Sequence, residues 1–184
     1  MLSALADLRV AVFRDWPYLY EGSRAYEEDY LARYAAAPGA VVVAARDGDR
    51  LVGAATGQPL AQEVEEFRAP FAAAGHDPAR FFYFAESVLD PAYRGQGIGH
   101  AFFDHREAHA RALGFDAAAF CAVIRGDDDP RRPDGYRPLD PFWRKRGYHP
   151  VDGLTVGFDW PDIGETTSSR KALQVWIREG LGPA

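Results

Sequence analysis

The segment LDPAYRGQGIGHAFF, residues 89–103, joins two regions of different periodicity. The run before it, RFFYFAESVL (80–89), is almost continuously apolar and predicts a buried strand. From about residue 97 to residue 113 the pattern predicts an amphipathic helix, which Gly114 ends. The junction itself carries an arginine and three glycines, which are Arg94, Gly95, Gly97 and Gly99.

A strand-to-helix junction of this kind suits an anion. The first N–H groups of a helix have no intrahelical acceptor, and the helix dipole adds partial positive charge. Glycines lack a Cβ atom, so phosphate oxygens can approach the backbone closely. The junction therefore predicts a phosphate or pyrophosphate site. The alternative is a turn whose glycines only permit tight packing.

The glycine spacing excludes two common phosphate-binding motifs. The dinucleotide fingerprint needs glycine at the first, third and sixth places, but the sixth place counted from Gly95 is His100. The P-loop needs a Gly-Lys-Ser/Thr ending, which the chain lacks. The junction does contain Arg-x-x-Gly-x-Gly, and it lies one helix before a strand and a short helix that ends in RKRGY (144–148).

The remaining patterns predict a single domain over residues 1–184 with a mixed sheet and helices on its faces. The strand–helix–strand unit around the glycines implies locally parallel strands. The expected order is helix, helix, hairpin, strand, helix, strand, helix, strand, strand. The helices cover 2–13, 23–37, 97–113 and 139–146, and the strands cover the hairpin 40–57, then 80–89, 115–124, 154–160 and 172–179.

Composition narrows the function classes. The net charge of −6 argues against nucleic acid as the main partner. One cysteine, Cys121, rules out an internal disulfide, and no apolar run is long enough for a membrane span. We therefore expect a soluble, cytoplasmic protein. We expect no metal, because His105 and His109 lack a third ligand and His105 falls within the apolar stripe of its helix.

With these residues, the sequence resembles the GNAT family of acyl-CoA-dependent N-acetyltransferases. LDPAYRGQGIG (89–99) looks like the acetyl-CoA signature of that family, and FWRKRGY (142–148) looks like its final helix-to-strand junction. The resemblance implies the α/β GNAT fold, a mixed and largely antiparallel twisted sheet that splays at the cofactor site. It also implies direct transfer of acetyl from acetyl-CoA to a primary amine, of a small molecule or a peptide, in a ternary complex.

The resemblance places the cofactor along two backbone segments. Ser87 and Leu89 would pair with the amides of pantetheine, as an added strand does. Residues of the glycine loop would bind the pyrophosphate through their N–H groups, with His100 close by; these residues are Arg94, Gly95, Gln96, Gly97, Ile98 and Gly99. The basic cluster 144–146 would reach the outer phosphate, or it only complements the end of its helix.

The catalytic groups are an oxyanion donor, a base and an acid, and alternatives remain open for the base and the acid. The resemblance implies that the backbone N–H of Leu89 stabilises the oxyanion. Glu86 is the one ionisable group inside the apolar run, so it is either a base near the amine or a carboxylate paired with an arginine. Many family members have tyrosine where this chain has Trp143, which cannot donate a proton at useful pH. Tyr136 is our substitute acid; otherwise it is a packed aromatic, or the thiolate leaves unaided.

The acceptor pocket should be formed by the loop between the first two helices and by the segment before the signature strand. An aromatic wall with acidic groups suits a cationic amine, although each residue alone could be core or solvated surface. The candidates are Trp16, Tyr18, Tyr20, Glu63, Glu65 and Glu66. The family usually starts with a strand, whereas this sequence begins almost directly in its first helix, so either the strand is absent or the sequence starts late. A missing edge strand would leave a sheet edge that a homodimer could cover.

Two other function classes stay open. One is a non-catalytic member of the same fold that binds acyl-CoA as a sensor or interaction module, and the absent tyrosine favours it. The other is a nucleotide-binding regulatory domain that uses the same glycine loop.

Overall fold

The computed structural model describes residues 2–182, which form one seven-stranded sheet flanked by helices. The helices are α1 (Leu2–Phe13), α2 (Arg24–Ala36), α3 (Glu65–Ala73), α4 (Ile98–Ala112) and α5 (Asp140–Lys145). The strands are β1 (Val41–Asp47), β2 (Arg50–Pro59), β3 (Phe81–Tyr83), β4 (Ser87–Leu89), β5 (Ala117–Val123), β6 (His149–Trp160) and β7 (Ser169–Glu179). Short 3-10 turns cover Leu60–Gln62, Pro78–Arg80 and Pro91–Tyr93.

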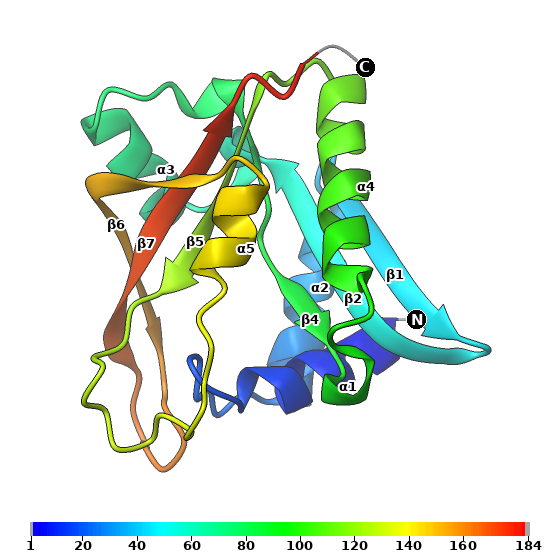
Figure 1. The fold of residues 1–184 in the computed structure, drawn as a ribbon, viewed down its shortest axis with the longest axis vertical. Coiled ribbons are helices and arrows are strands. Elements are labelled where there is room, and N and C mark those ends of the chain that lie inside the picture. Colours follow the sequence, from blue (N-terminus) through cyan, green and yellow to red (C-terminus); the bar gives the residue numbers. More distant parts are fainter. Residues whose placement is uncertain (1, 183–184) are drawn as a thin grey trace.

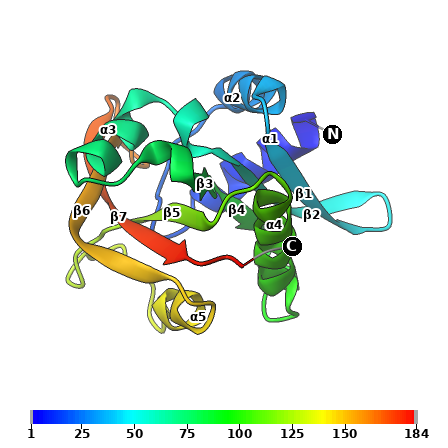
Figure 2. The ribbon, with the colours of Figure 1, turned by 90° about the horizontal axis from the view of Figure 1, so that it is seen from above.

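The sheet is mixed but largely antiparallel. The strand order is β1-β2-β3-β5-β7-β6, and β4 pairs with β2 beside this path. Only β3 and β5 run parallel to each other, and they belong to the strand–helix–strand unit that contains α4. Seen from above, α1, α2 and α3 cover one face of the sheet, and α4 and α5 cover the other (Figure 2). The fold class predicted from the sequence is confirmed.

Local signals account for several boundaries. The Ser23 hydroxyl accepts a hydrogen bond from the Tyr26 N–H at 3.3 Å and so caps α2, as its sequence position predicts. The turn between β1 and β2 is Gly48-Asp49, one residue later than the predicted Asp47-Gly48, because Asp47 still pairs with Arg50. Apolar side chains of the sheet and both helical layers are buried in three clusters, which explains why the long apolar runs became central strands.

The predicted strand 80–89 is in fact two strands with a break between them. β3 pairs with β5, and this pairing ends where the Phe84 N–H donates to the Ala119 carbonyl at 2.8 Å. From Ser87 onward, β4 pairs with β2 alone. Figure 1 shows β4 diverging from β5, so the two halves of the sheet separate below the break. This is the splay that the family resemblance implied.

A buried arginine from α4 stabilises the break. Arg106 is 1% exposed, and its guanidinium donates to the carbonyls of Thr56 and Glu86, each at 3.1 Å. It also donates to the Ser87 hydroxyl at 2.9 Å and stacks over the Phe84 ring at 4.2 Å. Burial lowers the pKa of Arg106 to about 10. The guanidinium thus adds a second donor to two carbonyls that already accept a backbone hydrogen bond, Thr56 from the Ala85 N–H at 3.2 Å and Glu86 from the Thr56 N–H at 3.0 Å.

The buried face of α4 differs from the expected one. The sequence placed His105 within the apolar stripe, but His105 is exposed, and the adjacent Arg106 and Glu107 are buried instead. Glu107 accepts hydrogen bonds from the Tyr148 hydroxyl at 3.2 Å and from Arg178 at 3.0 Å. Apolar periodicity could not find this face, because charged residues with specific partners occupy it.

Residues 2–182 contain neither a cluster suited to a metal ion nor a membrane-spanning helix. No group of three or more histidine, cysteine, aspartate and glutamate side chains in this part of the chain is arranged to hold a metal ion. None of the helices in the described range has the length and apolar character to cross a membrane.

Candidate functional site

A cleft of about 1200 Å³ opens where β4 and β5 separate. Most of its lining residues come from six segments: the loop after α1, the β3–β4 break with β4, the loop before α4, the first turns of α4, the second half of β5, and the loop and helix that follow β5. Strands β6 and β7 contribute Pro150, Gln174 and Trp176. The glycine junction therefore meets Trp16, Tyr18 and Glu86 in one place, although these residues are far apart in the sequence.

The glycine loop presents free backbone donors to this cleft. Gly95 and Gly97 have φ angles of 78° and 85°, in the left-handed region that favours glycine. The first hydrogen bond at the start of α4 runs from the Ala101 N–H to the Gly97 carbonyl at 3.2 Å. Among the described residues, the N–H groups of residues 95–100 have no backbone acceptor. The loop can thus bind an anion through these amides.

The predicted set of amides needs one correction. The Arg94 N–H already donates to the Pro91 carbonyl at 3.2 Å, because Arg94 ends the 3-10 turn before the loop. The Arg94 side chain lines the cleft and lies 3.5 Å from the Asp15 carboxylate. The Gln96 side chain folds back and donates to the Ala92 carbonyl at 3.2 Å. The free donors therefore begin at Gly95 rather than at Arg94.

Two arginines of the basic cluster 144–146 already contact other side chains of the protein. Arg146 pairs with Asp104 at 2.6 Å and with Glu107 at 3.2 Å, and its nitrogen lies 3.3 Å from Nδ1 of His100. The Arg144 guanidinium lies over the Trp176 ring at 5.3 Å. His100 also lines the cleft, so it faces the ligand space with Arg146 behind it.

The open edge of β4 carries a second set of backbone donors and acceptors. The Glu86 carbonyl accepts from the Thr56 N–H at 3.0 Å, and the Asp90 N–H donates to the Val52 carbonyl at 2.9 Å, so both residues turn their backbone toward β2. Backbone groups alternate in direction along a strand. The N–H and carbonyl groups of Ser87 and Leu89 therefore point away from β2, toward the cleft that these two residues line.

Glu86 lines the cleft at its inner end but is not a free carboxylate. It is 7% exposed, pairs with the Arg9 guanidinium, and accepts a hydrogen bond from the Tyr30 hydroxyl at 3.3 Å. Arg9 also contacts Glu27 at 2.5 Å. Burial by itself would lower the pKa of Arg9, but the charges of Glu86, Tyr30 and Glu27 raise it overall. Apolar spacing in α1 gave no sign of this buried arginine.

Aromatic side chains form the other end of the cleft. The Trp16 and Tyr136 rings meet edge-on with centroids 6.1 Å apart, although they come from the loops after α1 and after β5. Tyr18 packs on Phe13 at 4.6 Å, and burial and the nearby Glu86 raise its pKa to about 12. Burial and the charge of Asp140 also raise the pKa of Tyr136. Both phenols thus keep their protons at neutral pH.

Several predicted site residues lie elsewhere. Tyr20 does not line the cleft; it packs edge-on against Phe13 and forms an isolated bridge with Asp162. The three glutamates of the predicted acceptor wall, Glu63, Glu65 and Glu66, do not line it either. They belong to the segment at and just before α3, which packs against β6. Glu63 is nevertheless near Glu86, because burial and the charge of Glu86 both raise the pKa of Glu63.

Two residues that line the cleft, Trp143 and Cys121, are packed or buried side chains rather than reactive groups. Trp143 lines it and packs against Phe120 and Trp176, each with ring centroids 5.0 Å apart. Cys121 also lines the cleft, but burial raises the pKa of its thiol to about 12. The thiolate is the reactive form of cysteine, so this thiol is unreactive at neutral pH.

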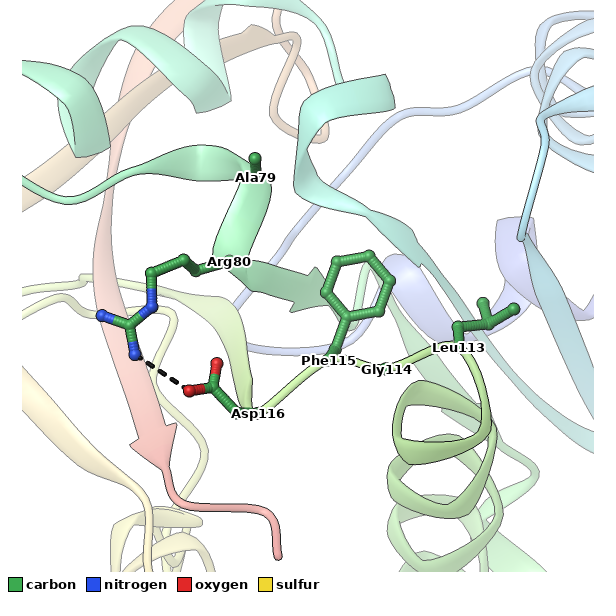
Figure 3. Close-up of a pocket in the computed structure, with 6 residues that line it drawn as sticks. All are labelled: Ala79, Arg80, Leu113, Gly114, Phe115 and Asp116. Carbon is green, nitrogen blue, oxygen red and sulfur yellow. Dashed lines mark hydrogen bonds and ion pairs between the residues drawn. The ribbon is translucent and has the colours of Figure 1, made fainter. Parts of the chain in front are cut away.

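A smaller pocket of about 400 Å³ lies beyond the end of α4 (Figure 3). Its lining includes Arg80, which pairs with Asp116 at 3.2 Å, and Phe115 between them and Leu113. None of the residues predicted to bind cofactor or acceptor lines this pocket. The cleft between β4 and β5 is therefore the candidate functional site.

The comparisons with known proteins agree with this geometry. The model of a family described as the acetyltransferase (GNAT) family matches residues 5–132. This range includes the glycine loop, β4 and β5. No curated protein matches the chain significantly.

Solved structures share the fold at low sequence identity. An aminoglycoside 6'-N-acetyltransferase complexed with coenzyme A is 17% identical, with a TM-score of 0.59 over 98% of this chain and 92% of that one. A ribosomal-protein-alanine N-acetyltransferase from Brucella melitensis is 15% identical, with a TM-score of 0.63 over 97% and 93%. The GphF GNAT-like decarboxylase in complex with isobutyryl-CoA is 19% identical, with a TM-score of 0.60 over 98% and 96%.

Proposed function

Because the chain belongs to the GNAT acetyltransferase family, we propose that it transfers the acetyl group of acetyl-CoA to a primary amine of a small molecule or peptide. The observation that carries the proposal is the continuity of two donor arrays in one cleft. The free amides of residues 95–100 lie at one end, and the open backbone edge of β4 leads away from them. A thioester with a diphosphate and two amides in its arm fits that sequence of groups.

In this proposal each array has a separate task. The amides from Gly95 to His100 bind the diphosphate, with the positive end of the α4 dipole behind them. Ser87 and Leu89 pair with the pantetheine amides along the free edge of β4, as an added strand would. Both tasks use main-chain groups whose direction is set by the fold, so they tolerate side-chain variation.

The chemical step needs stabilisation of one developing charge. The amine nitrogen attacks the thioester carbon, and the oxyanion that forms needs a hydrogen-bond donor. We assign this role to the Leu89 N–H, because the alternation along β4 directs it into the cleft. A preorganised donor of this kind contributes about 3–4 kcal/mol to the barrier in other enzymes.

Two side chains handle protons in our proposal. The Glu86 carboxylate, held by Arg9, accepts a hydrogen bond from the attacking amine and takes its proton, directly or through water. As the C–S bond breaks, the thiolate takes a proton from the Tyr136 hydroxyl, which is protonated at neutral pH. The alternative is that the thiolate leaves unaided. Trp143 has no proton to give.

A second candidate function is acyl-CoA binding without transfer. The observation that favours it is Trp143, which stands at the place where many family members have tyrosine and is packed against Phe120 and Trp176. The fold is also compatible with other chemistry, since one structural neighbour is named a decarboxylase. A nucleotide-binding regulatory role would use the same loop.

Two measurements separate these functions. Calorimetry should show binding of acetyl-CoA and no comparable binding of ATP or NAD. A nucleotide-binding module should instead bind ATP or NAD more tightly than acetyl-CoA. Thiol release from acetyl-CoA should then depend on an added amine. Acetyl-CoA binding with no thiol release for any amine would support the sensor, and no binding of coenzyme A or its thioesters would exclude both GNAT functions.

Three sequence predictions remain proposals. β1 pairs only with β2 among the described residues, so its outer edge is available to a second copy, and sedimentation would detect the homodimer. A single domain over 1–184 and a cytoplasmic location also stay predictions.

A further inference from the structure

Three of the four carboxylates on the cleft wall pair with arginines, and the fourth, Asp140, has no ion-pair partner among the described residues. Asp15 lies 3.5 Å from Arg94, Asp127 pairs with Arg132, and Glu86 pairs with Arg9. Each of these three acidic side chains lines the cleft, and each meets an arginine. A cationic ligand in the cleft would therefore have to compete with a guanidinium for each of these carboxylates.

The other charged side chains of the cleft wall do not give it a net negative charge. Asp140 lies in the first turn of α5, where the helix dipole stabilises a carboxylate. Arg125 pairs with Asp162 through two contacts of 2.7 and 2.8 Å. Arg137 lines the cleft and has no acidic partner within residues 2–182. The cleft wall thus has no surplus of negative charge, although the whole chain has a net charge of −6.

Apolar side chains dominate the acceptor end. Ile124 is 47% exposed and Leu139 is 54% exposed, and both line the cleft beside the Trp16–Tyr136 pair. Large apolar side chains exposed in a concave surface are typical of a ligand site. Aromatic rings on the same wall offer flat apolar area at a low cost in side-chain entropy.

This wall is held in place before any ligand binds. The Arg125 guanidinium donates to the carbonyls of Pro17 and Tyr18, at 2.9 and 2.8 Å, while it pairs with Asp162. The Trp160 indole N–H donates to the same Tyr18 carbonyl at 3.1 Å. The loop after α1 is therefore tied to β5 and to the end of β6, so the aromatic surface is preorganised.

Building on the proposed function, we propose that the acceptor is a monoamine with an apolar or aromatic body, rather than a polyamine or an aminoglycoside. One amine group can react beside Glu86 once it is neutral. A second ammonium group would be moved from water to a wall with no surplus of negative charge, which is costly. An apolar body instead gains about 25 cal/mol for each Å² that leaves water.

A matched pair of substrates tests this directly. Hexylamine and 1,6-diaminohexane differ only at the far end, where a hydrogen atom replaces an ammonium group. We expect kcat/KM for hexylamine to exceed that for the diamine, counted per amine, by about tenfold or more, and 2-phenylethylamine to rank with hexylamine. Equal values, or a preference for the diamine, spermidine or kanamycin, would overturn the inference.

A pair of variants tests the location. Leu139→Asp places a carboxylate on the acceptor wall, and it should lower the hexylamine-to-diamine ratio by about tenfold with the Kd of coenzyme A unchanged. Leu113→Asp is the matched control, because Leu113 is a leucine of similar exposure, 46%, that lies outside the cleft. It should leave the ratio unchanged. An equal effect of both variants would contradict the assignment of this wall.

Binding measurements keep the inference separate from the proposed function. If coenzyme A does not bind, the proposed function fails first. If coenzyme A binds but no amine is acetylated, calorimetry on the coenzyme A-loaded protein still decides the acceptor class. Tighter binding of hexylamine than of 1,6-diaminohexane supports the inference. Binding of neither amine, equal binding, or tighter binding of the diamine overturns it.

Discussion

A guanidinium nitrogen of Arg106 lies 3.1 Å from the carbonyl oxygen of Glu86, at the point where β4 separates from β5. The same nitrogen lies 3.1 Å from the Thr56 carbonyl. Both carbonyls also accept a backbone hydrogen bond, Thr56 from the Ala85 N–H and Glu86 from the Thr56 N–H. The Arg106 guanidinium therefore connects α4 to β2 and to the β3–β4 break at the place where the cleft opens.

The first prediction concerns this arginine. Arg106→Met should lower the free energy of unfolding by about 2–4 kcal/mol, because the hydrogen bonds of the buried guanidinium to the Thr56 and Glu86 carbonyls and to the Ser87 hydroxyl are lost. Urea denaturation would measure the change. Arg50→Met is the control, since the exposed Arg50–Asp90 pair should contribute only about 0–1 kcal/mol. Equal stability of the two variants would show that Arg106 does not support the break.

The second prediction separates two glycines of the loop. Gly99 lies in α4 with an ordinary φ, and a Cβ there would meet only Phe142 at 3.8 Å. Gly99→Ala should keep or raise stability, by up to about 1 kcal/mol, yet weaken coenzyme A binding by about tenfold through contact with the ligand. Gly97→Ala should cost about 1–2 kcal/mol of stability because of its positive φ. Unchanged coenzyme A affinity in Gly99→Ala would contradict a close approach of phosphate there.

The third prediction compares the two carboxylates that contact Arg9. Glu86→Gln and Glu27→Gln each remove one ion pair of the same buried guanidinium, so both should lose stability. Only Glu86 lines the cleft. Glu86→Gln should therefore reduce kcat/KM for the amine by about a hundredfold or more, with coenzyme A affinity unchanged. If Glu27→Gln reduced the rate equally, Glu86 would have a structural role only.

The fourth prediction concerns the proton for the leaving thiolate. Tyr136→Phe keeps the ring against Trp16 but removes the hydroxyl, and it should lower kcat by about a hundredfold at neutral pH. The raised pKa of Tyr136 keeps the acid form present above its ordinary value, so the wild-type rate should not fall before about pH 10. A thioester of a more acidic thiol should restore the rate of the variant. Wild-type activity in Tyr136→Phe would indicate that the thiolate leaves unaided.

The fifth prediction is loss of stability in alkali. Burial raises the pKa of both Tyr18 and Cys121 to about 12, whereas the unfolded chain releases these protons near pH 10 and 8.5. The unfolded state then holds fewer protons, so their contribution is complete below about pH 8.5 and falls as the pH rises toward 12. Urea titrations at pH 8 and pH 10.5 would measure the loss. Tyr18→Phe should reduce it, and equal wild-type stability at both values would refute the account.

Much of this protein could be predicted from its sequence, because the relevant signals are local. The glycine spacing, the hairpin turn and the cap at Ser23 depend on a few adjacent residues, and the structure has each of them, with the turn one residue later than predicted. The mixed sheet, the family and most of the order of helices and strands also followed from periodicity and from the motif. Helix α3 and the division of 80–89 into two strands were not in the expected order. Local conformational preferences act over such short distances that one chain segment is enough to read them.

The tertiary structure alone decided which distant residues meet. The apolar run 80–89 has no sequence signal for its break, since the break depends on β5 pairing with one half and β2 with the other. Arg9 and Arg106 interrupt apolar helix faces because carboxylates and carbonyls from other elements surround them. Trp16 meets Tyr136, while Tyr20 turns away toward Asp162. Such contacts are set by long-range packing and by the need to pair every buried polar group, and neither is recorded in the spacing of neighbouring residues.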